Sequence, residues 1–205
     1  YLGPRRTIVV VDDNEDHRDL MRETLAPMDF IVLTASSGPE CLTLIEGDTS
    51  QPITLPKVVV GARAVICTIG AKAPVGDDSP EKVDYEGVRN LILAARNAGV
   101  ARFVLISSLG VTHPEHPLNN FGRVLDWKLK GEEALRKSGL NYTIIRPGGL
   151  HDESGGKTAF KIGQGDTISG GRISRSDVAE IALAALDDIA TYHTTFEIVS
   201  EEGDP

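Results

Sequence analysis

The chain has 205 residues, 40% of them hydrophobic and 25% charged, which is typical of one large globular domain or two small ones. Its formal net charge of −9 argues against a nucleic-acid partner, because phosphate binding requires clustered lysine and arginine. No apolar stretch approaches the roughly 20 residues that span a bilayer, and no signal peptide is visible. We therefore expect a cytoplasmic protein without a membrane partner, whose oligomeric state the sequence does not indicate.

Apolar runs alternate with segments of helical periodicity along the chain. The predicted elements, in chain order, are a strand at 7–12, a helix at 14–26, strands at 30–35 and 63–68 with a short helix at 52–60 between them, a helix at 80–98, a strand at 103–107, a helix at 119–138, a strand at 142–146, a helix at 177–188 and a strand at 195–199. Residues 39–48 fit either one helix or a turn followed by a third strand. This alternation predicts a single three-layer α/β domain with a doubly wound parallel sheet.

Five stretches from residue 47 onward occur in a characteristic order and spacing. They are GDTSQPITL (47–55), AVICTIGA (64–71), VDYEGVRNLILAARNAGVARFVLISSLG (83–110), WKLKGEEALRKSGLNYTIIRPGGL (127–150) and ISGGRISRSDVAEIALAAL (168–186). Through these five stretches, residues 47–205 resemble the NAD(P)-binding, NmrA-like branch of the atypical short-chain dehydrogenase/reductase family. The resemblance implies a Rossmann-like fold, an NAD(P) cofactor and reductase or epimerase activity.

The resemblance implies a cofactor site at the ends of several strands. Asp48 would accept a hydrogen bond from the adenine amine, although a turn cap explains this residue equally well. Thr68, Gly70 and Ala71 end a strand where small residues let a ribose or nicotinamide approach the backbone, although a plain turn also explains them. The loop 147–149 would run over the nicotinamide, or would be a simple strand exit; its residues are Pro147, Gly148 and Gly149.

The resemblance also implies two catalytic residues. Ser107 ends a strand at the position where the family hydrogen-bonds a substrate carbonyl. Lys128 matches the lysine of the family's Tyr-x-x-x-Lys pair, in which residues four apart share one helix face. The tyrosine position is Val124, which has no hydroxyl, so proton transfer by a tyrosine is not expected. Lys128 can alternatively be a surface lysine beside Lys130.

Residues 1–46 follow a different pattern. A buried strand ends in Asp12 and Asp13, a helix follows, and a second strand leads to a turn with the sequence ASSGPE. This segment resembles the start of a response-regulator receiver domain, which has a flavodoxin-like strand order. In that family the acidic pair binds magnesium, an ion that takes oxygen ligands. The alternative is that Asp12 caps the helix and Asp13 lies near the positive end of its dipole.

Neither resemblance is complete at this end of the chain. The third receiver strand with its phosphoacceptor aspartate is missing, so phosphorylation is not expected. The first turn has aspartates instead of the glycines that a diphosphate needs. We therefore expect a natural or engineered hybrid, in which a receiver-like segment (1–46) replaces the first βαβ unit of a reductase (47–205) within one structural domain. The expected function is a chimeric scaffold without natural catalysis and with weak or lost NAD(P) binding. The alternatives are an NAD(P)-binding reductase or epimerase and a degenerate signalling module.

Overall fold

The architecture is a seven-stranded sheet between two layers of helices. A computed structural model describes residues 6–11, 19–23, 30–35, 47–156 and 158–201. From one edge to the other, the strands are β2 (Phe30–Ala35), β1 (Arg6–Val11), β3 (Ala64–Cys67), β4 (Arg102–Ile106), β5 (Tyr142–Pro147), β9 (Thr194–Glu201) and β7 (Ala159–Gly163). All neighbouring strands are parallel except β7, which runs antiparallel to β9. The predicted fold class, a Rossmann-like α/β sheet, is confirmed.

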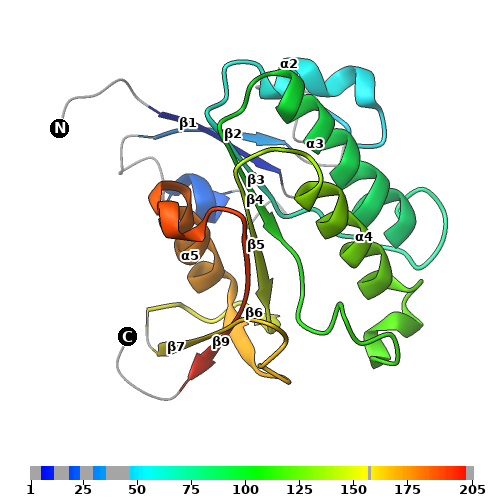
Figure 1. Cartoon of the computed structure of the whole chain (residues 1–205), viewed down its shortest axis with the longest axis vertical. Coiled ribbons are helices and arrows are strands. Elements are labelled where there is room, and N and C mark those ends of the chain that lie inside the picture. Colours follow the sequence, from blue (N-terminus) through cyan, green and yellow to red (C-terminus); the bar gives the residue numbers. More distant parts are fainter. Residues whose placement is uncertain (1–5, 12–18, 24–29, 36–46, 157, 202–205) are drawn as a thin grey trace.

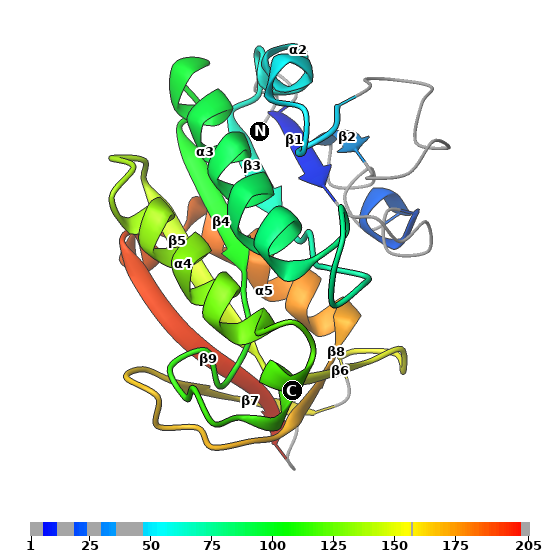
Figure 2. The same cartoon turned by 90° about the vertical axis from the view of Figure 1, so that its right-hand side faces the viewer.

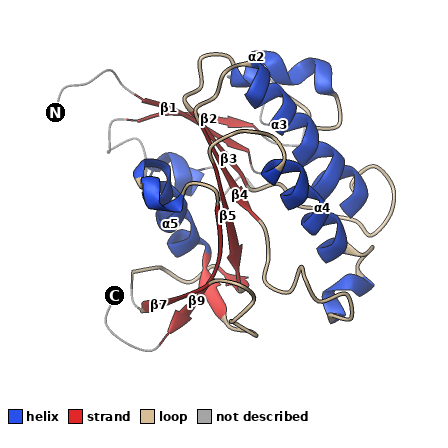
Figure 3. Cartoon of the chain, viewed as in Figure 1, coloured by secondary structure: helices blue, strands red, loops and turns tan. Residues whose placement is uncertain are grey.

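Helices cover both faces of the sheet (Figure 1, Figure 3). On one face lie α2 (Leu55–Val59), α3 (Val88–Asn97) and α4 (Val124–Arg136). On the other lie α5 (Arg175–Asp187) and the helical residues 19–23. Figure 2 shows α3 and α4 side by side across the sheet. No helix within the described ranges is long and apolar enough to cross a bilayer.

Successive side chains of each central strand point to opposite faces of the sheet and so contribute to two separate apolar cores. Phe103 and Leu105 of β4 pack with α2, α3 and α4, whereas Val104 and Ile106 pack with α5. Met21, from the helical residues 19–23, is buried in the second core. Because a parallel sheet with two covered faces buries every position, these strands read as continuous apolar runs in the sequence, which is why they were predictable.

Several helices begin at other residues than the sequence predicted. The helix predicted at 80–98 begins as a π-helix, η3 (Glu81–Gly87), and the one at 119–138 is preceded by the 3₁₀ turn η4 (Pro117–Asn120). Gly122 and Arg123 have positive φ angles of 55° and 61°, so no α-helix continues through them. The helix predicted at 177–188 begins two residues earlier, because the Ser174 hydroxyl accepts the hydrogen bond from the Asp177 N–H at 3.0 Å.

Other predicted boundaries need smaller corrections. The helix predicted at 52–60 is a 3₁₀ turn, η2 (Pro52–Thr54), followed by α2. The first strand ends at Val11, one residue before its predicted end, and the strand predicted at 30–35 is confirmed as β2. Residues 39–46 lie outside the described residues, so the choice between a helix and a third strand there stays open.

The segment 148–174 contains three strands that the sequence did not predict. β6 (Gly149–His151) pairs with β8 (Arg172–Ser174) in a small second sheet, and β7 adds an edge to the main sheet. Their burial follows no clear alternation, and Lys161 and Ile162 in the middle of β7 are both exposed. Strands this short and polar have no hydrophobic period to reveal them.

Candidate functional site

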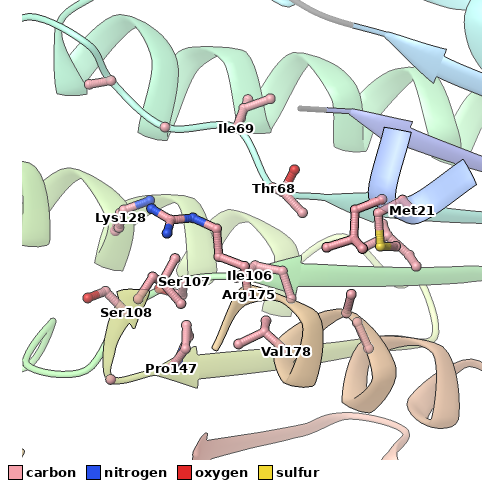
Figure 4. A pocket seen from close by; sticks show the side chains of 18 residues that line it. Met21, Thr68, Ile69, Ile106, Ser107, Ser108, Lys128, Pro147, Arg175 and Val178 are labelled. Carbon is pink, nitrogen blue, oxygen red and sulfur yellow. The ribbon is translucent and has the colours of Figure 1, made fainter. Parts of the chain in front are cut away.

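A cavity of about 440 Å³ opens at the carboxyl ends of β3, β4 and β5 (Figure 4). This is the side on which open α/β sheets bind ligands, next to the point where the strand order reverses, here between β1 and β3. Most of the predicted cofactor and catalytic residues line the cavity together, namely Thr68, Gly70, Ala71, Ser107, Lys128, Pro147 and Gly148. Asp48 and Gly149 do not.

Lys128 projects from the first turns of α4 into this cavity. Its ammonium forms an ion pair with Asp84, with 2.7 Å between Nζ and Oδ1. The Asp84 side chain is fully buried, whereas that of Lys128 is 18% exposed. The other Asp84 oxygen, Oδ2, accepts a hydrogen bond from the backbone N–H of Ala71 at 3.2 Å. The ion pair with Asp84 therefore fixes Lys128 in the cavity wall, and Lys128 is not a surface lysine.

Asp84 is a site residue that the sequence reasoning missed. It lies in the π-helix η3, a rare element that is often found at functional sites. The only signal in the sequence was a carboxylate among the inward-facing positions of a predicted helix. Helix α4 approaches η3 closely at Gly131, where an added Cβ would lie 2.6 Å from the Asp84 carbonyl oxygen. The glycine lets the two helices come near enough for the lysine and the aspartate to meet.

The loop after β3 lies against this ion pair. A Cβ built on Gly70 would be 3.9 Å from both the Asp84 carboxylate and the Lys128 ammonium. The backbone of residues 70 and 71 thus forms the wall between β3 and the lysine. Its contact with a ribose or a nicotinamide stays a prediction.

Ser107 follows β4 directly, and its backbone N–H donates to the Ile145 carbonyl at 2.7 Å. The residue is buried, at 6% exposure, and its hydroxyl has no hydrogen-bond partner among the described residues. A buried hydroxyl without a partner is costly, which points to a ligand that satisfies it. Val124, at the expected tyrosine position, is the first residue of α4 and does not line the cavity.

The loop 147–149 has a packing reason for its glycines. A Cβ on Gly148 would lie 2.5 Å from the carbonyl oxygen of Gly171 and 2.8 Å from the side chain of Val199. The Gly149 N–H donates to that same carbonyl at 2.9 Å. Pro147 and Gly148 line the cavity, while Gly149 begins β6.

Asp48 lies away from the cavity. Its carboxylate accepts hydrogen bonds from the Ser50 N–H at 2.8 Å, the Ser50 hydroxyl at 2.7 Å and the Gln51 amide at 3.0 Å. It therefore caps its own turn, and its adenine contact stays a prediction.

Arg175 is a second cavity residue that sequence reasoning missed. It is the first residue of α5, and Figure 4 shows its side chain pointing into the cavity toward the side that Ser107 and Lys128 line. The sequence offered only its place beside a helix cap.

The predicted magnesium ligands, Asp12 and Asp13, lie outside the described residues. Elsewhere, within the part of the chain that the structure describes, no group of three or more His, Cys, Asp or Glu residues could hold a metal ion.

Known proteins resemble this chain along most of its length. A family profile described as NAD(P)H-binding matches residues 31–189. The uncharacterized sugar epimerase YhfK of Bacillus subtilis (strain 168) is 32% identical over 202 residues, covering 98% of this chain and 89% of that protein. Sanguinarine reductase of Eschscholzia californica is 39% identical over 127 residues, covering 60% of this chain and 46% of that protein.

Other relatives are much longer than this chain. Protein TIC 62, chloroplastic, of Arabidopsis thaliana is 36% identical over 178 residues, which cover 81% of this chain and 27% of that protein. Among solved structures, the oxidoreductase ylbE from Lactococcus lactis has a TM-score of 0.80 at 23% identity, covering 97% of this chain and 92% of that one.

These comparisons overturn the hybrid scaffold. The family profile begins at residue 31, inside the segment interpreted as receiver-like, and the match to YhfK includes nearly the whole chain. The relatives are natural proteins, so a chimeric scaffold without natural function is wrong, and nothing supports a receiver domain at the N-terminus. The expected loss of NAD(P) binding is not confirmed either; the first turn, on which it rested, lies among residues that the structure does not describe.

Proposed function

Since the chain belongs to the NAD(P)H-binding family, we propose that it is an NAD(P)H-dependent reductase whose cavity takes the nicotinamide end of the cofactor. One observation carries the proposal. The Lys128 ammonium and the Ser107 hydroxyl, which has no partner within the described ranges, open on the same cavity, at the strand ends where such folds bind dinucleotides.

The residues present fit this cofactor. Gly70 and Ala71 form a wall without bulky side chains, and Lys128 lies directly behind it. Lys128 is suited to hydrogen-bond ribose hydroxyls, and Ser107 to hold an oxygen of the substrate. When bound, the reduced cofactor supplies a hydride.

Reduction suits the cavity better than epimerisation. An epimerase that oxidises an alcohol must remove the hydroxyl proton, which requires a base. The described lining contains two titratable side chains, Lys128 and Arg175, and both are donors without an acceptor site when charged. Reduction of a carbonyl needs the reverse, a proton donor to the new alkoxide, and the ammonium of Lys128 can be that donor. The missing tyrosine is compatible with this role because Lys128 would itself carry the proton, and the ion pair with Asp84 orients the lysine.

Binding of the cofactor is tested directly by calorimetric titration with NADPH and with NADH. We expect a dissociation constant in the micromolar range for at least one of them and a matching rise in the melting temperature. Lys128→Met should weaken binding about tenfold or more. Lys130→Met is the matched control, because Lys130 is exposed and lies over the Trp127 ring, 3.9 Å from its centroid. No binding of either nucleotide by the unaltered protein would refute the proposal.

A further inference from the structure

The charged side chains that line the cavity, among the described residues, are all positive. Of the eighteen side chains that line it, all within the described residues, only Lys128 and Arg175 are charged, and none is an aspartate or glutamate. Lys128 already has a buried counter-ion in Asp84. The charge that remains available to a ligand is therefore that of Arg175.

Arg175 is only weakly engaged by the protein. Its Nη1 donates to Asp152 at 2.7 Å, but the Asp152 side chain is 82% exposed and solvent screens such a pair strongly. Its Nε is buried and has no hydrogen-bond partner among the described residues. A guanidinium presents several donors in one plane, which matches a carboxylate or a phosphate.

The helix end beside Arg175 is already occupied by the protein itself. The hydroxyl of Ser174 caps α5 through the Asp177 N–H, and the hydroxyl of Ser176 accepts from the Gly155 N–H at 2.8 Å. The carboxylate of Asp177 accepts from the Gly156 N–H at 2.8 Å. These contacts fix the first turn of α5 and leave the arginine side chain, not the helix dipole, as the group that faces the cavity.

We infer that Arg175 and Ser107 form a binding site for an anionic group, a carboxylate or a phosphate, inside this cavity. Both contribute a polar atom that is buried and has no partner among the described residues, and both line the same space. The inference rests on the proposed reductase function to this extent: it gives that reductase an acidic small molecule as its substrate class. The same chemistry would also hold a phosphate of the cofactor.

Paired titrations with benzoate and its neutral counterpart benzamide test the site. We expect benzoate to bind the unaltered protein at least tenfold more tightly than benzamide. Arg175→Gln should remove that preference, and Arg172→Gln should keep it, because Arg172 is exposed and does not line the cavity. Equal binding of the two probes, or a preference that survives Arg175→Gln, would overturn the inference.

A second variant keeps the test valid if Arg175→Gln does not fold. Asp152→Asn changes an exposed side chain and removes the carboxylate that competes for Arg175. Benzoate should then bind several-fold more tightly, and unchanged or weaker binding would count against the site.

Repeating the titrations with saturating NADP⁺ separates the two sources of the anion. Benzoate that still binds indicates a substrate carboxylate, whereas benzoate that is displaced indicates a phosphate of the cofactor; both agree with an anion site. If the protein binds no nucleotide, the reductase proposal fails, and the benzoate preference of the free protein still decides the anion site.

Discussion

The ammonium nitrogen of Lys128 lies 2.7 Å from Oδ1 of Asp84, a carboxylate whose side chain is fully buried. In the family that the sequence resembles, a tyrosine four residues before the lysine would share its helix face. In this chain the partner comes from another helix, and it is an acid. The pair ties the loop after β3, the π-helix η3 and helix α4 together around one wall of the cavity.

Replacing Asp84 by asparagine should lower both stability and NADPH affinity. The change leaves the Lys128 charge without a counter-ion, and because the lysine is 18% exposed we expect a loss of about 2 kcal/mol, below the ~3–5 kcal/mol of a fully buried pair. Urea unfolding and calorimetric titration measure the two effects. Asp77→Asn, at an exposed position, is the control. An Asp84→Asn protein with full NADPH affinity would show that the pair does not position the lysine.

Replacing Gly131 by alanine should also destabilise the protein, although alanine is the better helix former by about 1 kcal/mol. The new Cβ would lie 2.6 Å from the Asp84 carbonyl oxygen, so α4 must move away from η3. We expect a net loss of about 1–3 kcal/mol, typical of overpacking, and weaker NADPH binding. Gly170→Ala is the control, because nothing lies within 4 Å of a Cβ there. A stabilised Gly131→Ala protein would contradict the close approach.

Arg146 in β5 is predicted to contribute strongly to the stability of the fold through buried ion pairs. Its guanidinium pairs with Glu132 through two hydrogen bonds, of 3.0 and 2.7 Å, and with Asp166 at 2.7 Å. Burial disfavours the charged form of Arg146. The hydrogen bond and the charge of Glu132, followed by the charges of Asp166 and Glu197, outweigh this effect and raise the pKa of Arg146 above its usual value.

Arg146→Met should therefore cost about 3 kcal/mol, at the lower end for a broken buried pair, because it leaves Glu132 with only the partly exposed Arg136 as a counter-ion. Chemical unfolding measures the loss. Lys137→Met removes only the exposed pair with Glu133 and should stay within ~1 kcal/mol of the unaltered protein. A similar small effect for both variants would show that the buried network is not needed for stability.

Arg102 in β4 makes a second buried contact set, to backbone carbonyls and a ring. It donates to the carbonyls of Asn141 at 3.1 Å and Ala185 at 2.8 Å, and its guanidinium lies 4.2 Å from the centroid of the Tyr192 ring. Burial lowers the pKa of Arg102, yet arginine stays charged at any ordinary pH.

Arg102→Lys should be destabilising by about 1–3 kcal/mol, since a lysine keeps the charge but cannot place planar donors on two carbonyls. The melting temperature reports the effect. Arg63→Lys, at an exposed position, should leave it unchanged. Equal melting temperatures for the two variants would mean that charge alone, and not the planar fork, is required.

Local sequence determined the central strands and the residues at their ends. β3, β4 and β5 are continuous apolar runs because both faces of a parallel sheet are covered, so the sequence alone placed Thr68, Ser107 and Pro147 at one edge of the sheet. The motifs likewise indicated Lys128 and a nucleotide fold. The same reasoning misjudged the N-terminal segment, where a short acidic pattern outweighed the resemblance of the rest of the chain.

Only the tertiary structure decided how charges meet in the cavity. Asp84 and Lys128 lie on different helices, and their contact depends on a π-helix and on the close approach at Gly131, neither of which has a hydrophobic period. Arg175 faces the cavity because Ser174 starts the helix two residues earlier than the sequence suggested. Apolar burial repeats along a strand or helix and can be read locally, but the pairing of ionisable groups depends on the depth and angle at which distant elements pack.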